Sequence, residues 1–152
     1  MKRNRKFFSR LSGFTLVELM LTITLVTVLA GLSIPLYQSF QVKNATDIAA
    51  NTLAQTFRRA QIISRASDGD TSWGVKAQNG SIVLFKGASY SGRDTTFDEI
   101  FNLPSTITPS GATEIVYTKF TGIPQATGTI TLTASTGDIR TLTINSKGTV
   151  TY

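Results

Sequence analysis

The sequence GFTLVELMLTITLVTVLAGLSIPL, residues 13–36, decides how this chain is organised. After Glu18 it contains no ionisable side chain, and the next one apart from tyrosine is Lys43. Its apolar body, residues 19–36, approaches the roughly 20 residues that a helix needs to cross a membrane, and counting from Phe14 extends it to about 23. The stretch therefore predicts a membrane-spanning helix.

A basic leader precedes this stretch. Five of the 15 basic residues of the chain lie in the first thirteen positions, namely Lys2, Arg3, Arg5, Lys6 and Arg10. From Phe14 onward ten basic residues face nine acidic ones, so the formal net charge falls from +6 to +1. The positive charge belongs to the leader and does not indicate a nucleic-acid-binding domain.

Glu18 is the unusual residue of the apolar stretch. Ionisable residues in mid-membrane cost on the order of 2.5–3.5 kcal/mol, so a carboxylate there marks a function and needs a partner. Residues 14–42 contain no side-chain cation. Cleavage after Gly13 would supply one, because it frees the α-amino group of Phe14, which is largely protonated at neutral pH. The amine and Glu18 can meet within one helix or between staggered neighbouring helices.

Three other kinds of N-terminal segment share parts of this pattern. A secretory signal peptide has the same basic and apolar regions, and Val28-Leu29-Ala30 offers small residues at a plausible cleavage site. A lipoprotein signal would need a cysteine after Ala30-Gly31, and the chain has none. A plain single-span anchor is the third. None of the three accounts for Glu18.

The run from the basic leader through Gly13, Phe14 and Thr15-Leu16-Val17-Glu18 resembles the class III signal of type IV pilins and type II secretion pseudopilins. The resemblance implies that a prepilin peptidase cuts after Gly13 and N-methylates Phe14, and that Glu18 is the assembly residue. It also implies inner-membrane insertion with the head outside the cytoplasm. The implied partners are membrane lipid, the inner-membrane assembly platform and other pilins or pseudopilins in a helical filament.

Gly31 and Pro35 weaken the predicted helix, because proline removes a hydrogen bond and clashes with the carbonyl four residues back. We expect a kink there; the alternative is that the helix ends there. Pro35 also falls where many members of the resembling family carry a helix-bending proline. Apolar residues then recur at three- and four-residue steps from Lys43 to Ala66, which predicts an amphipathic helix. A continuous helix from Phe14 to Ala66 would be about 80 Å long.

Beyond Thr71 the chain is rich in Thr, Ser, Gly, Val and Ile with period-two stretches, which predict one antiparallel sheet of about six or seven strands with the helix packed on it. Asn79-Gly80 is the strongest hairpin signal. The fold class is α+β. The predicted parts are a cleaved leader at 1–13, an apolar transmembrane and assembly helix at 14–41, and an amphipathic helix with a β-rich head at 42–152.

The head resembles minor pseudopilins and minor pilins of the GspH or FimT type. Trp73-Gly74-Val75 and residues 81–85, 138–145 and 147–150 carry this resemblance. The absence of a C-terminal cysteine pair departs from many major pilins. The resemblance implies a minor subunit.

No enzyme activity, cofactor or metal site is expected. The chain has neither Cys nor His, which excludes thiolate metal sites and Ser-His-Asp triads. Asp68-Gly69-Asp70 holds too few ligands for calcium and is interpreted as a helix stop.

DNA capture by a minor tip pilin is the alternative function. Arg58, Arg59 and Arg65 would supply the contacts, because clustered cations dominate the affinity of proteins for DNA. Arg58 and Arg59 point to different azimuths of the predicted helix, however, and a solvated helix face is the simpler interpretation.

Overall fold

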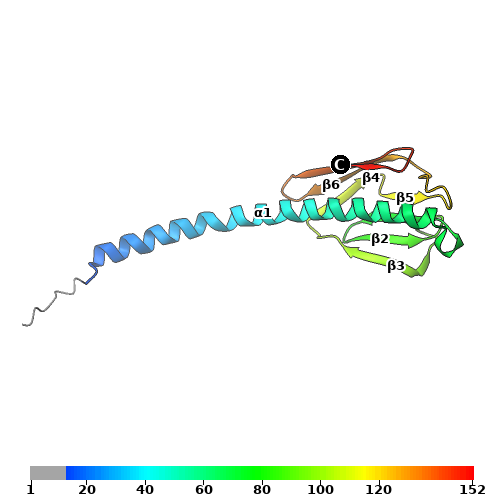
Figure 1. Ribbon diagram of the computed structural model, residues 1–152. Helices are drawn as coiled ribbons and strands as arrows, with labels where there is room; N and C mark the ends of the chain where they lie inside the picture. Colours follow the sequence, from blue (N-terminus) through cyan, green and yellow to red (C-terminus); the bar gives the residue numbers. More distant parts are fainter. Residues whose placement is uncertain (1–12) are drawn as a thin grey trace, which may run out of the picture. The chain divides into compact units, whose positions relative to one another are not determined.

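The structure, a computed structural model, describes residues 13–152, except for the side chains of residues 32–36. The leader predicted at 1–13 lies outside the described residues apart from Gly13. The chain divides into two units, Met1–Gln38 and Ser39–Tyr152, and each is described by itself. One helix, α1 (Leu16–Arg65), contributes to both (Figure 1).

The α+β class and the long helix predicted from the sequence are confirmed. α1 has 50 residues and begins and ends within two residues of the predicted bounds. It runs through Gly31 and Pro35, so the helix does not end there. The kink at these two residues stays a prediction.

Threonine hydroxyls in the first unit bond back to the helix carbonyls. Thr22 Oγ1 donates to the Leu19 carbonyl at 2.9 Å, and Thr24 Oγ1 donates to the Met20 carbonyl at 2.7 Å. These hydroxyls need no partner outside the helix, as expected for threonine in an apolar helix.

Within the described part of the chain, no helix combines the length and the apolarity that crossing a membrane requires.

The second unit contains two four-stranded antiparallel sheets. The first has the order β3-β2-β1-β5 and the second the order β4-β6-β7-β8. Their bounds are β1 Trp73–Gln78, β2 Ser81–Lys86, β3 Asp94–Asn102, β4 Ile107–Gly111, β5 Glu114–Tyr117, β6 Gly128–Ala134, β7 Ile139–Ile144 and β8 Val150–Thr151.

The predicted hairpin at Asn79-Gly80 is confirmed. Gln78 of β1 pairs with Ser81 of β2, which leaves Asn79 and Gly80 as the two-residue turn. Gly80 has a φ of 85°, a conformation that glycine adopts without steric cost. The register of this hairpin places Val75 opposite Leu84.

The single sheet of six or seven strands expected from the sequence is wrong, because the second unit has eight strands in two sheets. The strand that the prediction missed is β4, whose sequence Ile-Thr-Pro-Ser-Gly holds two residues that disfavour strands. β4 forms the edge of its sheet, where Pro109 is tolerated because its missing N–H can face away from the ladder.

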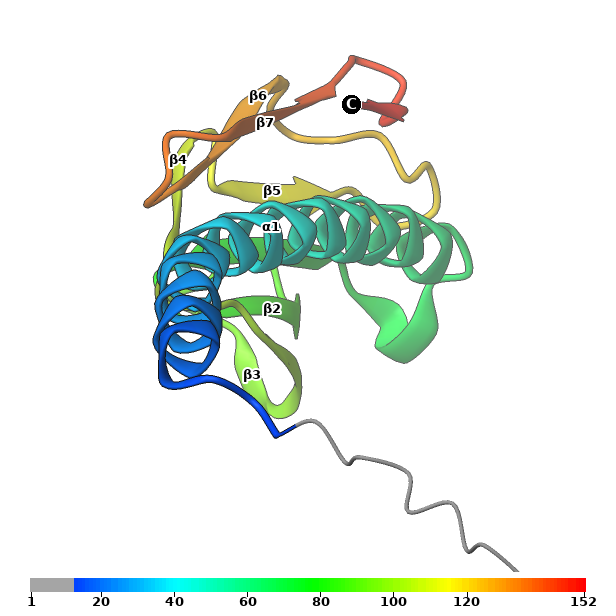
Figure 2. The ribbon, with the colours of Figure 1, turned by 90° about the vertical axis from the view of Figure 1, so that its left-hand side faces the viewer.

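The core of the second unit lies between α1 and both sheets (Figure 2). Leu53, Phe57 and Ala60 of α1 are fully buried, at the helical spacing that the sequence predicted. They pack in one cluster with Ile82 and Leu84 of the first sheet, and with residues of the second sheet that include Ile130, Leu132, Leu142 and Ile144. Because this cluster buries one face of α1, the opposite face of the helix is exposed to solvent.

Candidate processing and assembly site

The predicted cleavage junction lies just ahead of the helix. Gly13, Phe14 and Thr15 are not helical, and α1 begins at Leu16. All three residues are exposed, and Phe14 is 81% exposed. The Gly13–Phe14 peptide bond is therefore accessible and free of helical hydrogen bonding, which a peptidase needs in order to reach a backbone carbonyl.

Thr15 and Glu18 have the spacing of a capping box, in which a hydroxyl accepts from the backbone N–H three residues on. The Glu18 backbone N–H donates to Thr15 Oγ1 at 3.2 Å. The Leu19 N–H donates to the Thr15 carbonyl at 3.1 Å, which closes the first turn. Thr15 therefore sets where the helix begins, immediately after the predicted cleavage junction.

The Glu18 carboxylate lies in the first turn of α1. Negative charge is favoured there, because the helix dipole and the unpaired N–H groups make this end electropositive. Within the part of the chain that the structure describes, Glu18 forms no ion pair. Its carboxylate is available to a cation from outside these residues or to a new α-amino group at Phe14.

Large apolar side chains surround Glu18 on every side of the helix. Those exposed between Phe14 and Leu29 are Phe14, Leu16, Val17, Leu19, Met20, Leu21, Ile23, Leu25, Val26, Val28 and Leu29. A helix that is apolar all round is stable only when lipid or other protein covers it. In such surroundings a Glu18–ammonium pair would be held in a low dielectric, where the attraction is far stronger than in water.

The three arginines proposed for DNA contact do not act alike. Arg59 pairs with Glu99 of β3 at 2.5 Å, and Arg65 Nε donates to the Thr121 carbonyl at 3.2 Å. Among the described residues, Arg58 forms no ion pair. Two of the three arginine side chains are thus engaged within the second unit.

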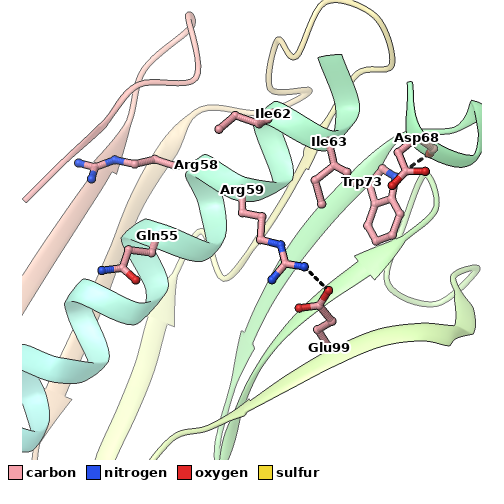
Figure 3. Close-up of a pocket in the computed structure, with 8 residues that line it drawn as sticks. All are labelled: Gln55, Arg58, Arg59, Ile62, Ile63, Asp68, Trp73 and Glu99. Atoms are coloured by element: carbon pink, nitrogen blue, oxygen red, sulfur yellow. Dashed lines mark hydrogen bonds and ion pairs between the residues drawn. The ribbon is translucent and has the colours of Figure 1, made fainter. Parts of the chain in front are cut away.

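An open groove of about 450 Å³ lies between α1 and β3 (Figure 3). We call it the α1–β3 groove, and it is lined by Gln55, Arg58, Arg59, Ile62, Ile63, Asp68, Trp73 and Glu99. Sequence reasoning missed it, because its residues come from segments up to 44 positions apart and form no motif. The predicted helix stop Asp68-Gly69-Asp70 forms a short 3₁₀-helix beside it, η1 (Asp68–Asp70).

Comparison with known proteins gives one match. Residues 9–34 match the family model of the prokaryotic N-terminal methylation motif. The match spans the Gly13–Phe14 junction, Thr15 and Glu18, and extends along the apolar part of α1 to residue 34. No curated protein matches the chain, and no solved structure does.

Proposed function

The chain carries the N-terminal methylation motif of the type IV pilin and pseudopilin family, and we propose that it is a structural subunit of a type IV pilus or a type II secretion pseudopilus. The observation that carries the proposal is the first turn of α1, where Thr15 starts the helix and Glu18 projects a carboxylate among exposed apolar side chains. This arrangement suits a subunit whose helix is buried by its neighbours.

Processing comes first in this proposal. A prepilin peptidase cuts the exposed Gly13–Phe14 bond and methylates the new α-amino group of Phe14. A secondary amine keeps its positive charge at neutral pH, so methylation does not remove the cation. The cut also discards the five cations of the leader, and the new amine becomes the cation nearest to Glu18 along the chain.

Assembly follows from the charge that processing creates. The amine of one subunit meets the Glu18 carboxylate of a neighbour when two parallel helices are staggered. A buried pair of this kind is weak as a source of stability, but leaving either partner unpaired costs about 3–5 kcal/mol. The pair therefore favours one register of the helices over all others.

The location of the chain changes with these steps. Before assembly, the apolar segment is held in the cytoplasmic membrane with the second unit outside the cytoplasm. After assembly, the same side chains are covered by other subunits at the assembly platform. The exposed apolar surface from Phe14 to Leu29 supports both environments, because each covers it.

The second unit supports a minor rather than a major subunit. The chain has no cysteine, and its head consists of one half of α1 and eight short strands. The strand motif Trp73-Gly74-Val75 of β1 and the closing hairpin of β7 and β8 are the features that resemble GspH or FimT type heads. The role is structural, and the apolar helix rather than an active site performs it.

Filament shearing tests this function. The full-length chain is expressed in a bacterium with a prepilin peptidase and a pilus or pseudopilus assembly system, and surface filaments are sheared off and probed for the chain. We expect the processed chain in the sheared fraction. A processed chain that remains entirely in the membrane under conditions in which filaments form would contradict it.

A further inference from the structure

Two residues near the cleavage junction, Thr15 and Gly13, are suited to begin α1. The structure begins the helix after Thr15, at Leu16. Glycine ranks close to threonine among residues that precede a helix, so a longer helix that begins after Gly13 is the competing arrangement. In an α-helix each N–H donates to the carbonyl four residues back. The longer helix would therefore join the Val17 N–H to the Gly13 carbonyl, which is the carbonyl of the predicted cleavage junction.

The Thr15 hydroxyl opposes this longer helix directly. The Glu18 N–H donates to Thr15 Oγ1 at 3.2 Å. In the longer helix the same N–H would donate to the Phe14 carbonyl, so the hydroxyl and that carbonyl compete for one donor. Within residues 13–152, the Gly13 carbonyl accepts no backbone hydrogen bond. The side chain of Thr15 therefore favours the shorter helix, which leaves the junction outside its first turn.

Packing does not hold the junction out of the helix. Gly13, Phe14 and Thr15 are all exposed, and a Cβ added to Gly13 would meet no described atom within 4 Å. In the membrane that the proposed function requires, the need to bond every backbone polar group favours the longer helix. Among the described residues, the bond to Thr15 Oγ1 is the interaction that opposes this extension.

We propose that Thr15 is a positioning residue for cleavage, because its hydroxyl keeps the Gly13–Phe14 peptide bond in a form that a prepilin peptidase can attack. Hydrolysis breaks the bond between the Gly13 carbonyl carbon and the Phe14 nitrogen. Water supplies the second oxygen of the new Gly13 carboxylate, and its two protons end on the Phe14 nitrogen, which becomes the ammonium group. A Gly13 carbonyl that is bonded in the first turn of a helix must be released before this step.

Thr15 acts through the backbone at Glu18 in this role and touches none of the reacting atoms. The inference rests on the proposed function and adds to it the residue that controls the rate of processing. It also separates two roles within one turn of helix, since the Glu18 N–H serves cleavage through Thr15 and the Glu18 carboxylate serves assembly.

Cleavage of the full-length chain in detergent by a purified prepilin peptidase tests this role. Thr15→Val keeps the shape of the side chain and removes the hydroxyl. Loss of a threonine at the start of a helix changes the balance between two starts by about fivefold, so we expect the initial rate of cleavage to fall by about that factor. Thr22→Val is the matched control, because the Thr22 hydroxyl bonds to the Leu19 carbonyl inside the helix and its loss should leave the rate unchanged.

Two further variants distinguish the helix start from direct recognition of the Thr15 side chain by the peptidase. Thr15→Asn has a different shape but begins helices at least as well as threonine, so it should be cleaved at the rate of the unchanged chain. The double variant Thr15→Val with Leu16→Pro has no hydroxyl. Proline is favoured at the first helical position and keeps the residue before it out of the helical conformation, so this variant should regain most of the lost rate.

Amide hydrogen exchange of the uncleaved chain measures the helix start itself. In Thr15→Val the Val17 N–H should exchange more slowly, because it gains the Gly13 carbonyl as an acceptor, and Leu16→Pro should reverse this change. Equal cleavage rates for Thr15→Val and the unchanged chain overturn the proposal. A slow Thr15→Val that neither Thr15→Asn nor Leu16→Pro restores also overturns it, because the peptidase then recognises the side chain directly. An unchanged chain that the active peptidase does not cut after Gly13 refutes the proposed function, and the inference with it.

Discussion

The backbone N–H of Glu18 donates to Thr15 Oγ1 at 3.2 Å, so the side chain of Thr15 and the backbone of Glu18 together begin the helix. The Glu18 carboxylate is not needed for this bond. Residue 18 can therefore lose its charge while the helix keeps its start. This separation allows the role of the carboxylate in assembly to be tested without disturbing the cleavage junction.

Replacement of the Glu18 carboxylate should block assembly and spare processing. In Glu18→Gln the new amine of Phe14 loses its partner inside an apolar environment, at a cost of about 3–5 kcal/mol. Since each 1.4 kcal/mol is a factor of ten, incorporation into sheared filaments should fall at least about tenfold. Glu18→Asp keeps the charge and serves as the control, with incorporation above that of Glu18→Gln. Normal incorporation of Glu18→Gln would show that assembly does not need the Glu18 carboxylate.

Gln61 should stabilise the second unit by joining two loops to α1. Its Nε2 donates to the Gly122 carbonyl at 3.0 Å and to the Lys147 carbonyl at 2.9 Å. Gln61→Ala leaves both carbonyls without this donor, and we expect a loss of about 1–3 kcal/mol in the free energy of unfolding. Denaturant unfolding of the full chain in detergent, followed by the fluorescence of Trp73, measures it, because Trp73 is the single tryptophan and is buried.

Gln55→Ala is the matched control for that experiment. Gln55 lies on the exposed face of the same helix, so its replacement should change the free energy of unfolding by less than about 0.5 kcal/mol. Equal effects of the two substitutions would show that the loops do not depend on Gln61.

Gly74 should resist substitution because of Phe85. A Cβ on Gly74 of β1 would overlap the ring of Phe85, which lies opposite in β2 and is fully buried. Gly74→Ala should therefore destabilise the second unit by about 1–3 kcal/mol, as overpacking does. In Gly92→Ala the new Cβ meets only Ser89 Oγ, at 3.3 Å, and this control should cost less. A neutral Gly74→Ala in the same unfolding assay would contradict the packing of β1 on β2.

Tyr117 should make the second unit sensitive to alkali. Its side chain is fully buried, and burial raises the pKa of its phenol above the ordinary value near 10. The unfolded chain then loses this proton at a lower pH than the folded chain does, so stability is retained below about pH 10 and falls as the pH rises further. The unfolding free energy of Tyr117→Phe should fall less between pH 9 and 11 than that of the unchanged chain. Tyr152→Phe, at an exposed position, should behave as the unchanged chain does.

Sequence patterns predicted the parts of the fold that depend on local chemistry. The stripe of Leu53, Phe57 and Ala60 predicted a buried helix face, and Asn79-Gly80 predicted the β1–β2 turn. Both depend on residues close in sequence. β4 escaped prediction because its pairing with β6, which includes Pro109 opposite Leu132, is a tertiary contact that overrides a weak strand propensity.

The processing junction and the α1–β3 groove differ in how far the sequence predicts them, for the same reason. The Gly13–Phe14 junction and Glu18 form a contiguous motif, and the match over residues 9–34 covers them. The left-handed backbone of Phe120 has no local signal, because it results from bonds to Ser64 and to other residues of α1 that are more than 50 positions away. The α1–β3 groove likewise exists only once α1 packs against the first sheet.

Mass spectrometry of the mature N-terminus shows directly whether the chain is cut after Gly13 and methylated at Phe14. The chain is purified from a host that has a prepilin peptidase, and the terminal peptide is sequenced by fragmentation. We expect a chain that begins at Phe14 with one methyl group on its α-amino nitrogen. A chain that begins at Gly31, or one that retains the leader and Gly13 in the presence of the active peptidase, would contradict it.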